Sequence, residues 1–279
     1  MLTTILLRIA RIMPFGGWRF VKLAAHYDRS LQAKPVTIEN IPYTIFIDLR
    51  DASTCNLFLN NTSTGSRKLR LILPKVMRPG DIFYDVGANL GMVSAVAHQA
   101  IGPTGKIVAF EPNVRVSRLY EKTFAGSSNV IINNVALAEH AGELPFYLSP
   151  TSVRSSFSPI RGVEPITVAV RPMADVISEF GAPNVVKVDV EGHEEQVFRG
   201  VQDHFLGEKC PIIIFEAHSL EEFGSTAAMI SKLHGGPGMF LHVRDGGQLA
   251  PIDETKHSSD YFYVPEHYRE RVDEILGQK

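Results

Sequence analysis

Residues 85–91, with the sequence DVGANLG, have the residue types of a ligand-binding loop. They connect a β-rich run at 82–86 to a small, apolar, helix-like run at 90–100. A glycine at such a turn permits tight backbone geometry and lets a ligand approach the main chain. The helix that follows offers N–H groups with no intrahelical partner. The pattern predicts a ligand site formed around Gly87, Asn89 and Gly91.

The charge beside this loop indicates which kind of ligand it suits. A dinucleotide site needs G-x-G-x-x-G, and this loop lacks the triple-glycine spacing. Asp85 precedes the first glycine by two residues and would repel a pyrophosphate, whereas it favours a cationic group. S-adenosylmethionine carries a sulfonium and an ammonium and therefore matches that sign. Glu111, beyond the next strand, is expected to accept hydrogen bonds from ribose hydroxyls of either ligand and does not discriminate between them.

Four acids stand at or beside the ends of predicted strands: Asp85, Glu111, Asp189 and Glu216. The predicted strands alternate with helix-like segments, and each strand is an almost unbroken run of apolar residues. This pattern is typical of a parallel sheet covered by helices on both faces. Such sheets bind ligands beyond the carboxyl ends of their strands. We therefore predict a doubly wound α/β fold with an acidic cleft at that edge.

The chain is predicted to divide into a sheet domain at 79–279 and an extension at 1–78 that contains helices and a hairpin. The hairpin strands are expected at 36–39 and 43–47. Within residues 1–27, apolar residues recur at helical spacing (Leu2, Ile5, Leu6, Ile9 and Ile12), and four basic residues interrupt the apolar runs. No stretch reaches the roughly 20 apolar residues of a membrane span, and a signal peptide fits poorly. A helix docked on the domain is the favoured interpretation; a basic amphipathic segment with weak membrane-surface association is the alternative.

Composition narrows the functional classes. The 279 residues are 44% hydrophobic and 21% charged, as in globular proteins. Because the net charge is −2, we expect no nucleic-acid partner. Cys55 and Cys210 form no CxxC pair, which argues against a zinc finger or a disulfide scaffold and fits a cytoplasmic location.

Three motifs in order resemble the FkbM-type S-adenosylmethionine-dependent methyltransferases. They are DVGANLG at 85–91, FEP at 110–112 and VKVDVEGHE at 186–194, and the resemblance covers about residues 79–265. It implies a class I methyltransferase (Rossmann-like) fold, whose seven-stranded sheet is mostly parallel with one antiparallel strand. It also implies S-adenosylmethionine as cofactor and O-methylation of a saccharide or natural-product hydroxyl. His193 departs from the family, where a small residue is common, and residues 1–78 carry no family motif.

Proton transfer is assigned to the loop after the fourth strand. A hydroxyl nucleophile needs a proton acceptor, and alternate residues of this loop are expected to face the cleft. Asp189 and Glu191 are therefore candidates for the base or for positioning the acceptor, with His193 as a further candidate base. The same three residues could also hold a divalent cation. We predict no metal, because the family interpretation explains the acids without one.

Further residues are assigned to binding. Asn134 follows the third strand and is a candidate for contacting adenine, with an ordinary turn residue as the alternative. Ser155 and Ser156 lie in a polar loop that is long enough to cover the cleft. Glu216 and His218 follow the fifth strand and are candidates for lining the acceptor pocket, with a satisfied residue at the sheet edge as the alternative for each.

Two rival functions remain open at this point. A nicotinamide-dependent oxidoreductase can use the same scaffold, although the missing third glycine and Asp85 count against it. A non-catalytic nucleotide-binding module is the second rival, and the acids at the strand ends count against it.

Overall fold

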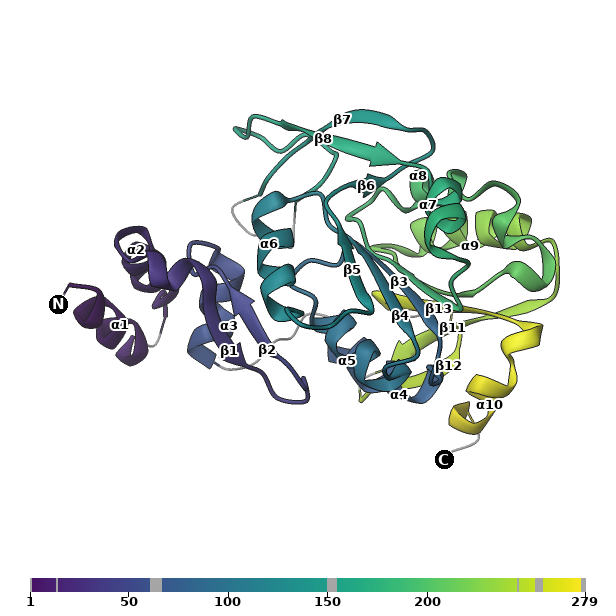
Figure 1. The fold of residues 1–279 in the computed structure, drawn as a ribbon, viewed down its shortest axis with the longest axis horizontal. Helices are drawn as coiled ribbons and strands as arrows, with labels where there is room; N and C mark the ends of the chain where they lie inside the picture. The colour runs from purple at the N-terminus through teal and green to yellow at the C-terminus, as the bar shows by residue number, and fades with distance from the viewer. Residues whose placement is uncertain are drawn as a thin grey trace.

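A central eight-stranded sheet organises the structure, a computed structural model that describes residues 2–13, 15–60, 67–149, 155–244, 246–253 and 258–276. Its strands, in spatial order, are β12 (Gln248–Pro251), β11 (Gly238–Arg244), β13 (Asp260–Pro265), β10 (Ile212–Glu216), β9 (Val185–Val188), β3 (Ile82–Val86), β4 (Lys106–Phe110) and β5 (Val130–Asn133). Figure 1 shows the sheet in the middle of the molecule.

The strand directions confirm the predicted fold class. β10, β9, β3, β4 and β5 pair in parallel, and β13 runs antiparallel to both β10 and β11. The sheet without β12 is the seven-stranded class I methyltransferase sheet. The predicted number of seven is one too low, because a turn at Gly246-Gly247 brings β12 back antiparallel to β11 at the sheet edge.

Helices cover both faces of the sheet, as the apolar strands require. Side chains alternate across each strand, so Phe83 of β3 joins one hydrophobic core and its neighbour Tyr84 joins the other. The first core includes α4 (Arg67–Val76), α5 (Met92–Ile101), α6 (Val114–Thr123) and α10 (Glu270–Leu276). The second includes α7 (Met173–Phe180), α8 (Glu194–Arg199) and α9 (Leu220–His234).

The part of the chain between β5 and α7 forms a small second sheet, which the sequence did not predict. Its strand order is β6 (Ala136–Leu137), β8 (Ile166–Arg171) and β7 (Gly142–Phe146). β8 is followed at once by α7, which carries Asp175 in its first turn. The apolar pattern is weak here because β7 and β8 are largely exposed, which explains why periodicity missed them.

The N-terminal part contains α1 (Leu2–Ile12), α2 (Trp18–Tyr27), α3 (Ala52–Asn60) and a hairpin of β1 (Lys34–Thr37) with β2 (Thr44–Ile47). The hairpin confirms the two predicted strands, and β2 packs against α6. α1 and α2 project at the end of the molecule away from the sheet (Figure 1). Among the described residues, none of the helices combines the length and apolar character needed to cross a bilayer. The cytoplasmic location stays a prediction.

α4 belongs with the layered part of the structure, although the division at 78/79 assigns it to the extension. It packs against α5 and α10, and its buried apolar side chains join the same core as Phe83. Pro74 sits inside this helix without ending it.

Candidate active site

A cavity of about 580 Å³ opens at the carboxyl ends of β3, β4, β9 and β10. Pockets for small molecules and cofactors measure roughly 300–1,000 Å³, so this one has room for a nucleoside-sized ligand. Ser53 and Leu57 of α3 and Lys68 of α4 line its opposite side. Residues 1–78 therefore supply part of the pocket wall, which no motif in the sequence indicated.

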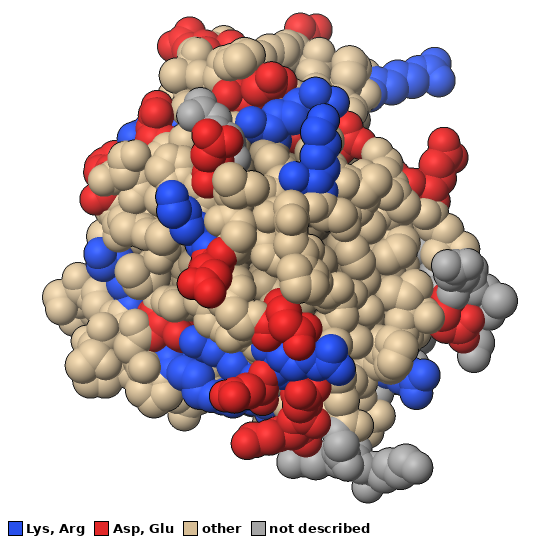
Figure 2. Space-filling view, turned by 90° about the vertical axis from the view of Figure 1, so that its right-hand side faces the viewer, with Lys and Arg blue, Asp and Glu red and all other residues tan. Residues whose placement is uncertain are grey.

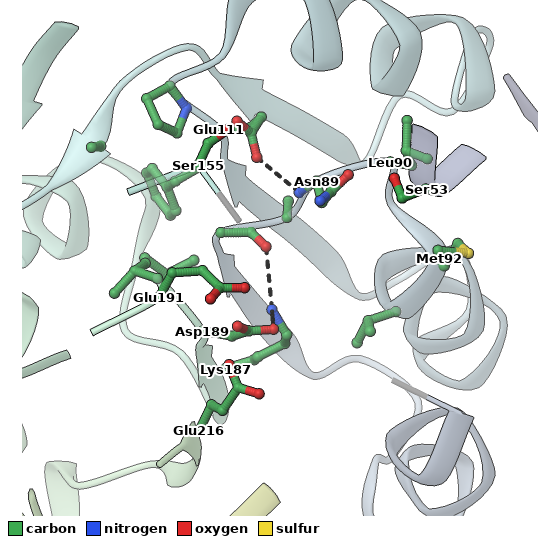
Figure 3. A pocket seen from close by; sticks show the side chains of 18 of the residues that line it. Ser53, Asn89, Leu90, Met92, Glu111, Ser155, Lys187, Asp189, Glu191 and Glu216 are labelled. Atoms are coloured by element: carbon green, nitrogen blue, oxygen red, sulfur yellow. Dashed lines mark hydrogen bonds and ion pairs between the residues drawn. The ribbon is translucent and has the colours of Figure 1, made fainter. Parts of the chain in front are cut away.

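The structure brings most of the predicted site residues into this one cavity (Figure 3). Those that line it are Gly87, Asn89, Glu111, Ser155, Asp189, Glu191 and Glu216. The predicted residues that are not among those lining it are Asp85, Gly91, Asn134, Ser156, His193 and His218.

The two glycines of the loop serve close packing. Gly87 has φ +76°, and a Cβ there would lie 1.9 Å from the carbonyl oxygen of Asp189. The absent side chain thus lets the β3 loop pass directly over the β9 loop. Gly91 has φ +78°, and a Cβ there would meet the ring of Tyr120 at 2.7 Å. A ligand was expected to approach the backbone at these glycines. Protein atoms instead fill the space beside both of them.

Glu111 is held by main-chain donors. The N–H of Asn89 donates to one carboxylate oxygen at 3.0 Å, and the N–H of Asn113 donates to the other at 2.9 Å. Burial raises the pKa of this carboxyl to about 7, although both hydrogen bonds act to lower it. The side-chain oxygen of Asn89 is itself buried with no hydrogen-bond partner in the described structure. A fixed carboxylate and an unsatisfied amide oxygen therefore stand together on the pocket wall.

Lys187, which the sequence analysis did not single out, is the positive centre beneath the pocket. Its ammonium lies 3.3 Å from Asp85 and 3.1 Å from Asp189, and it donates to the carbonyl of Gly87 at 3.3 Å. Burial acts to lower the pKa of Lys187, but the two carboxylates outweigh it and hold that pKa above its usual range. Asp85 is fully buried and also accepts from Ser94, so it acts on the pocket through Lys187 rather than by facing a ligand.

Asp189 and Glu216 share one negative charge. Burial raises the pKa of Glu216 to about 9, helped by the charge of Asp189 and by their hydrogen bond. Burial also opposes ionisation of Asp189, but Lys187 and the Glu216 hydrogen bond outweigh it and keep the pKa of Asp189 below its usual range. At neutral pH the proton of the pair therefore resides on Glu216.

Glu191 lines the open side of the pocket, and His218 stands beside Glu191 without lining the cavity. Glu191 has φ +55° in the loop after β9, and its carboxylate lies 3.8 Å from Nε2 of His218. The same nitrogen lies 3.9 Å from Glu216. The ligand atoms of these three residues fall within 4.8 Å of one another, a different trio from the one weighed for a metal in the sequence. The absence of a metal stays a prediction.

The remaining predicted residues make contacts within the protein. His193 packs its ring on Phe157 with centroids 4.6 Å apart, and burial lowers its pKa. Asn134 donates through its amide to the carbonyl of Glu111 at 2.8 Å. Ser156 donates to the carbonyl of Glu191 at 3.3 Å, which places it behind the loop that carries the acid. Their predicted roles in catalysis and binding stay predictions.

A sequence model described as the methyltransferase FkbM domain matches residues 85–245. The chain belongs to the FkbM methyltransferase family. Hexuronic acid methyltransferase AglP of Haloferax volcanii is 30% identical over 155 residues, which are 54% of this chain and 61% of AglP. The match thus spans less than two thirds of that relative. The 31-O-demethyl-FK506 methyltransferase FkbM of Streptomyces tacrolimicus is 27% identical over 57% of this chain and 73% of its own length.

Likeness to solved structures is weaker. Aeropyrum pernix fibrillarin, in complex with natively bound S-adenosyl-L-methionine, has a TM-score of 0.44 and 14% identity over 71% of this chain and 74% of its own. The family match confirms the predicted family and S-adenosylmethionine as its cofactor. The FkbM-family residues around the pocket fit that cofactor, because Glu111 and Asn89 offer fixed acceptors for its hydroxyl and amino groups.

Proposed function

We propose that this protein is an S-adenosylmethionine-dependent O-methyltransferase that acts on a hydroxyl of a saccharide or another small hydroxylated molecule. One observation carries the proposal: a single cavity joins Glu111, fixed by two backbone N–H groups, to Glu191 on its open side. The first suits a ribose, and the second suits a hydroxyl that must lose its proton.

When bound, S-adenosylmethionine supplies a methyl group on a sulfonium, which is a good leaving group. The protein then has mainly to align the reactants and to accept a proton. Alignment can lower a barrier by about 7–11 kcal/mol, and a general base contributes roughly 10²–10⁴-fold. Glu111 would orient the ribose through its carboxylate. The charge shared by Asp189 and Glu216 would complement a cationic ligand group.

Among the acids of the open side, Glu191 is the one best suited to take the hydroxyl proton. Asp189 is engaged by Lys187 at 3.1 Å, which lowers its pKa and weakens it as a base. Glu216 already holds a proton at neutral pH because its pKa is about 9. Nε2 of His218 lies 3.8 Å from the carboxylate of Glu191. This ring can stabilise the carboxylate, or it can carry the proton that Glu191 takes from the hydroxyl to solvent.

The proposed acceptor draws on the relatives. The name of AglP specifies a hexuronic acid, and that of the Streptomyces relative specifies an oxygen of FK506. We expect a small-molecule or glycan acceptor here as well, with no nucleic acid.

Two measurements test the proposed function. Calorimetry with S-adenosylmethionine, S-adenosylhomocysteine and NAD should show binding of the first two only. Labelled S-adenosylmethionine is then incubated with a panel of hexuronic acids, neutral saccharides and polyketides, and the products are examined by mass spectrometry for an added CH₂. Binding of NAD alone would favour an oxidoreductase. Donor binding with no methyl transfer to any acceptor would favour a binding module.

A further inference from the structure

The first helix carries more apolar surface than its neighbour covers. Leu6 and Ala10 are buried where α1 meets α2. Leu2, Ile5 and Ile12 recur at helical spacing on the adjoining side of α1, and their exposed fractions are 54%, 46% and 80%. The helix therefore packs on α2, and part of its apolar side faces solvent; docking of α1 on the sheet domain itself stays a prediction.

The exposed apolar side chains gather at this end of the chain. Eleven large hydrophobic residues are exposed in the described parts of the structure, and seven of them fall within residues 2–27. These seven are Leu2, Ile5, Ile12, Met13, Phe15, Leu23 and Tyr27. The other four are scattered over separate elements, as single exposed apolar residues commonly are. A gathered apolar surface instead marks a place of interaction.

The charged residues within 1–27 have one sign. Residues 1–27 include Arg8, Arg11, Arg19 and Lys22 and no acid, although the whole chain has a net charge of −2. Arg8 and Arg11 are exposed on α1; Arg8 lies about one turn from both Ile5 and Ile12, and Arg11 directly precedes Ile12. Figure 2 shows the opposite end of the molecule, where basic and acidic side chains are interspersed.

We propose that α1 and the segment after it lie on the surface of a membrane that contains anionic lipids. The apolar set of Leu2, Ile5, Ile12 and Phe15 would enter the boundary between headgroups and acyl chains, with Arg8 and Arg11 at the level of the phosphates. A basic amphipathic helix binds a bilayer in this orientation, parallel to its plane. This partner is additional to the small molecules of the proposed function.

The charges favour a lipid surface over a second copy of the chain. A two-fold interface brings the same patch of both subunits together. Arg8 and Arg11 would then approach their own copies, and no acid within residues 1–27 would neutralise them. An anionic bilayer neutralises both arginines while it covers the apolar side chains.

α2 packs against both α1 and α3. Asn56 of α3 lines the catalytic pocket and also borders a small hollow together with Arg11 and Phe15. The proposed membrane contact therefore lies close to the outer side of the catalytic pocket.

Vesicle sedimentation with the full chain tests this proposal. Vesicles of phosphatidylcholine with one quarter phosphatidylglycerol should bind the protein, and vesicles of phosphatidylcholine alone should bind it at least tenfold more weakly. Each basic residue near an anionic surface contributes about fivefold to binding. The variant Arg8→Gln/Arg11→Gln should therefore bind anionic vesicles about 25-fold more weakly, and added salt should reduce wild-type binding. Ile5→Ser/Ile12→Ser should lower binding to both kinds of vesicle.

Matched controls lie elsewhere on the surface. Lys209→Gln/Lys232→Gln removes two exposed cations, and Leu206→Ser removes an exposed apolar side chain; neither should change vesicle binding. Circular dichroism must show that all variants remain folded. Two results would overturn the proposal: equal binding by the Arg8/Arg11 variant and the wild type, or a lipid-free dimer, detected by analytical ultracentrifugation, that Ile5→Ser/Ile12→Ser dissociates.

Discussion

The two walls of the pocket are held in place by different means. We propose that the wall formed by Gly87, Asn89, Glu111 and Lys187 binds the methyl donor, and we call it the donor wall. Its polar groups are tied to the main chain. Both oxygens of Glu111 accept from backbone N–H groups, and Lys187 donates to a backbone carbonyl. We propose that the wall with Glu191 and Glu216 binds the acceptor, and we call it the acceptor wall. Its two acids meet His218, beside the cavity, through their side chains at 3.8 and 3.9 Å.

This difference separates two tasks that a methyltransferase must perform. Contacts to the main chain fix a group wherever the fold forms, which suits a donor that is the same in every reaction. Contacts between partly exposed side chains can be rearranged by substitution without disturbing the sheet, which suits a varied acceptor. Changes on the donor wall should therefore affect binding and stability, and changes on the acceptor wall should affect turnover.

The largest effect is expected at Gly87, where the donor wall has no space. In Gly87→Ala the new Cβ would lie 1.9 Å from the carbonyl of Asp189, in addition to the strain of φ +76°. We expect calorimetry to detect no binding of S-adenosylhomocysteine. Gly126→Ala is the control, because Gly126 also has a positive φ of +94° but no atom lies within 4 Å of its added Cβ. It should cost only about 1–2 kcal/mol of stability and leave binding intact. Wild-type affinity in Gly87→Ala would show that the two loops can separate freely.

Removing the buried cation should have the next largest effect. Lys187→Met leaves the fully buried Asp85 without its ion pair, and breaking such a pair costs about 3–5 kcal/mol. The pKa of Lys187 is raised, so its contribution is complete below the usual lysine range and is lost only as pH rises above it. Urea unfolding at pH 7 is therefore a suitable measurement.

A second substitution makes the Lys187 prediction specific. Adding Asp85→Asn to Lys187→Met removes the uncompensated charge and should recover part of the lost free energy of unfolding. Lys209→Met, at an exposed lysine, should change that free energy by less than about 0.5 kcal/mol. No recovery in the double variant would mean that the cost of Lys187→Met comes from packing rather than from charge.

The sequence predicted both acids of the acceptor wall and three of the four residues of the donor wall, and the residues it missed were missed for a physical reason. Gly87 and Glu111 follow consecutive strands of one β-α-β unit, so their meeting at the sheet edge follows from topology alone. Lys187 was missed because it interrupts an apolar run, 185–188, whose hydrophobic pattern alone predicts the strand. Ser53 and Leu57 line the same cavity from a helix remote in sequence, and no local pattern reports such packing.

On the acceptor wall, Glu191→Gln should lower turnover without changing donor binding. The amide cannot accept the hydroxyl proton, so kcat should fall by about 10²–10⁴-fold. The affinity for S-adenosylhomocysteine should stay within about twofold of the wild type, because Glu191 belongs to the other wall. Glu208→Gln, at an exposed glutamate, is the control and should leave both values unchanged. An unchanged kcat in Glu191→Gln would remove Glu191 as the base and direct attention to Asp189.

The smallest effect is expected at Glu111, and its pH dependence links the geometry of the donor wall to its charge. Because the pKa of Glu111 is raised to about 7, the carboxyl becomes protonated in the folded protein as pH falls through that value. A protonated carboxyl loses acceptor sites for the ribose hydroxyls, so affinity for S-adenosylhomocysteine should fall up to about tenfold from pH 8 to pH 6.

Glu111→Gln should weaken binding at pH 8 by about 1.5–3 kcal/mol, the scale of hydrogen bonds to charged groups, and should abolish the pH dependence between 6 and 8. Glu121→Gln, at an exposed position on α6, should retain both the affinity and its pH dependence. If Glu111→Gln kept the wild-type pH profile, the titrating group would lie elsewhere, and Glu111 would act on the donor only through its contacts to the backbone.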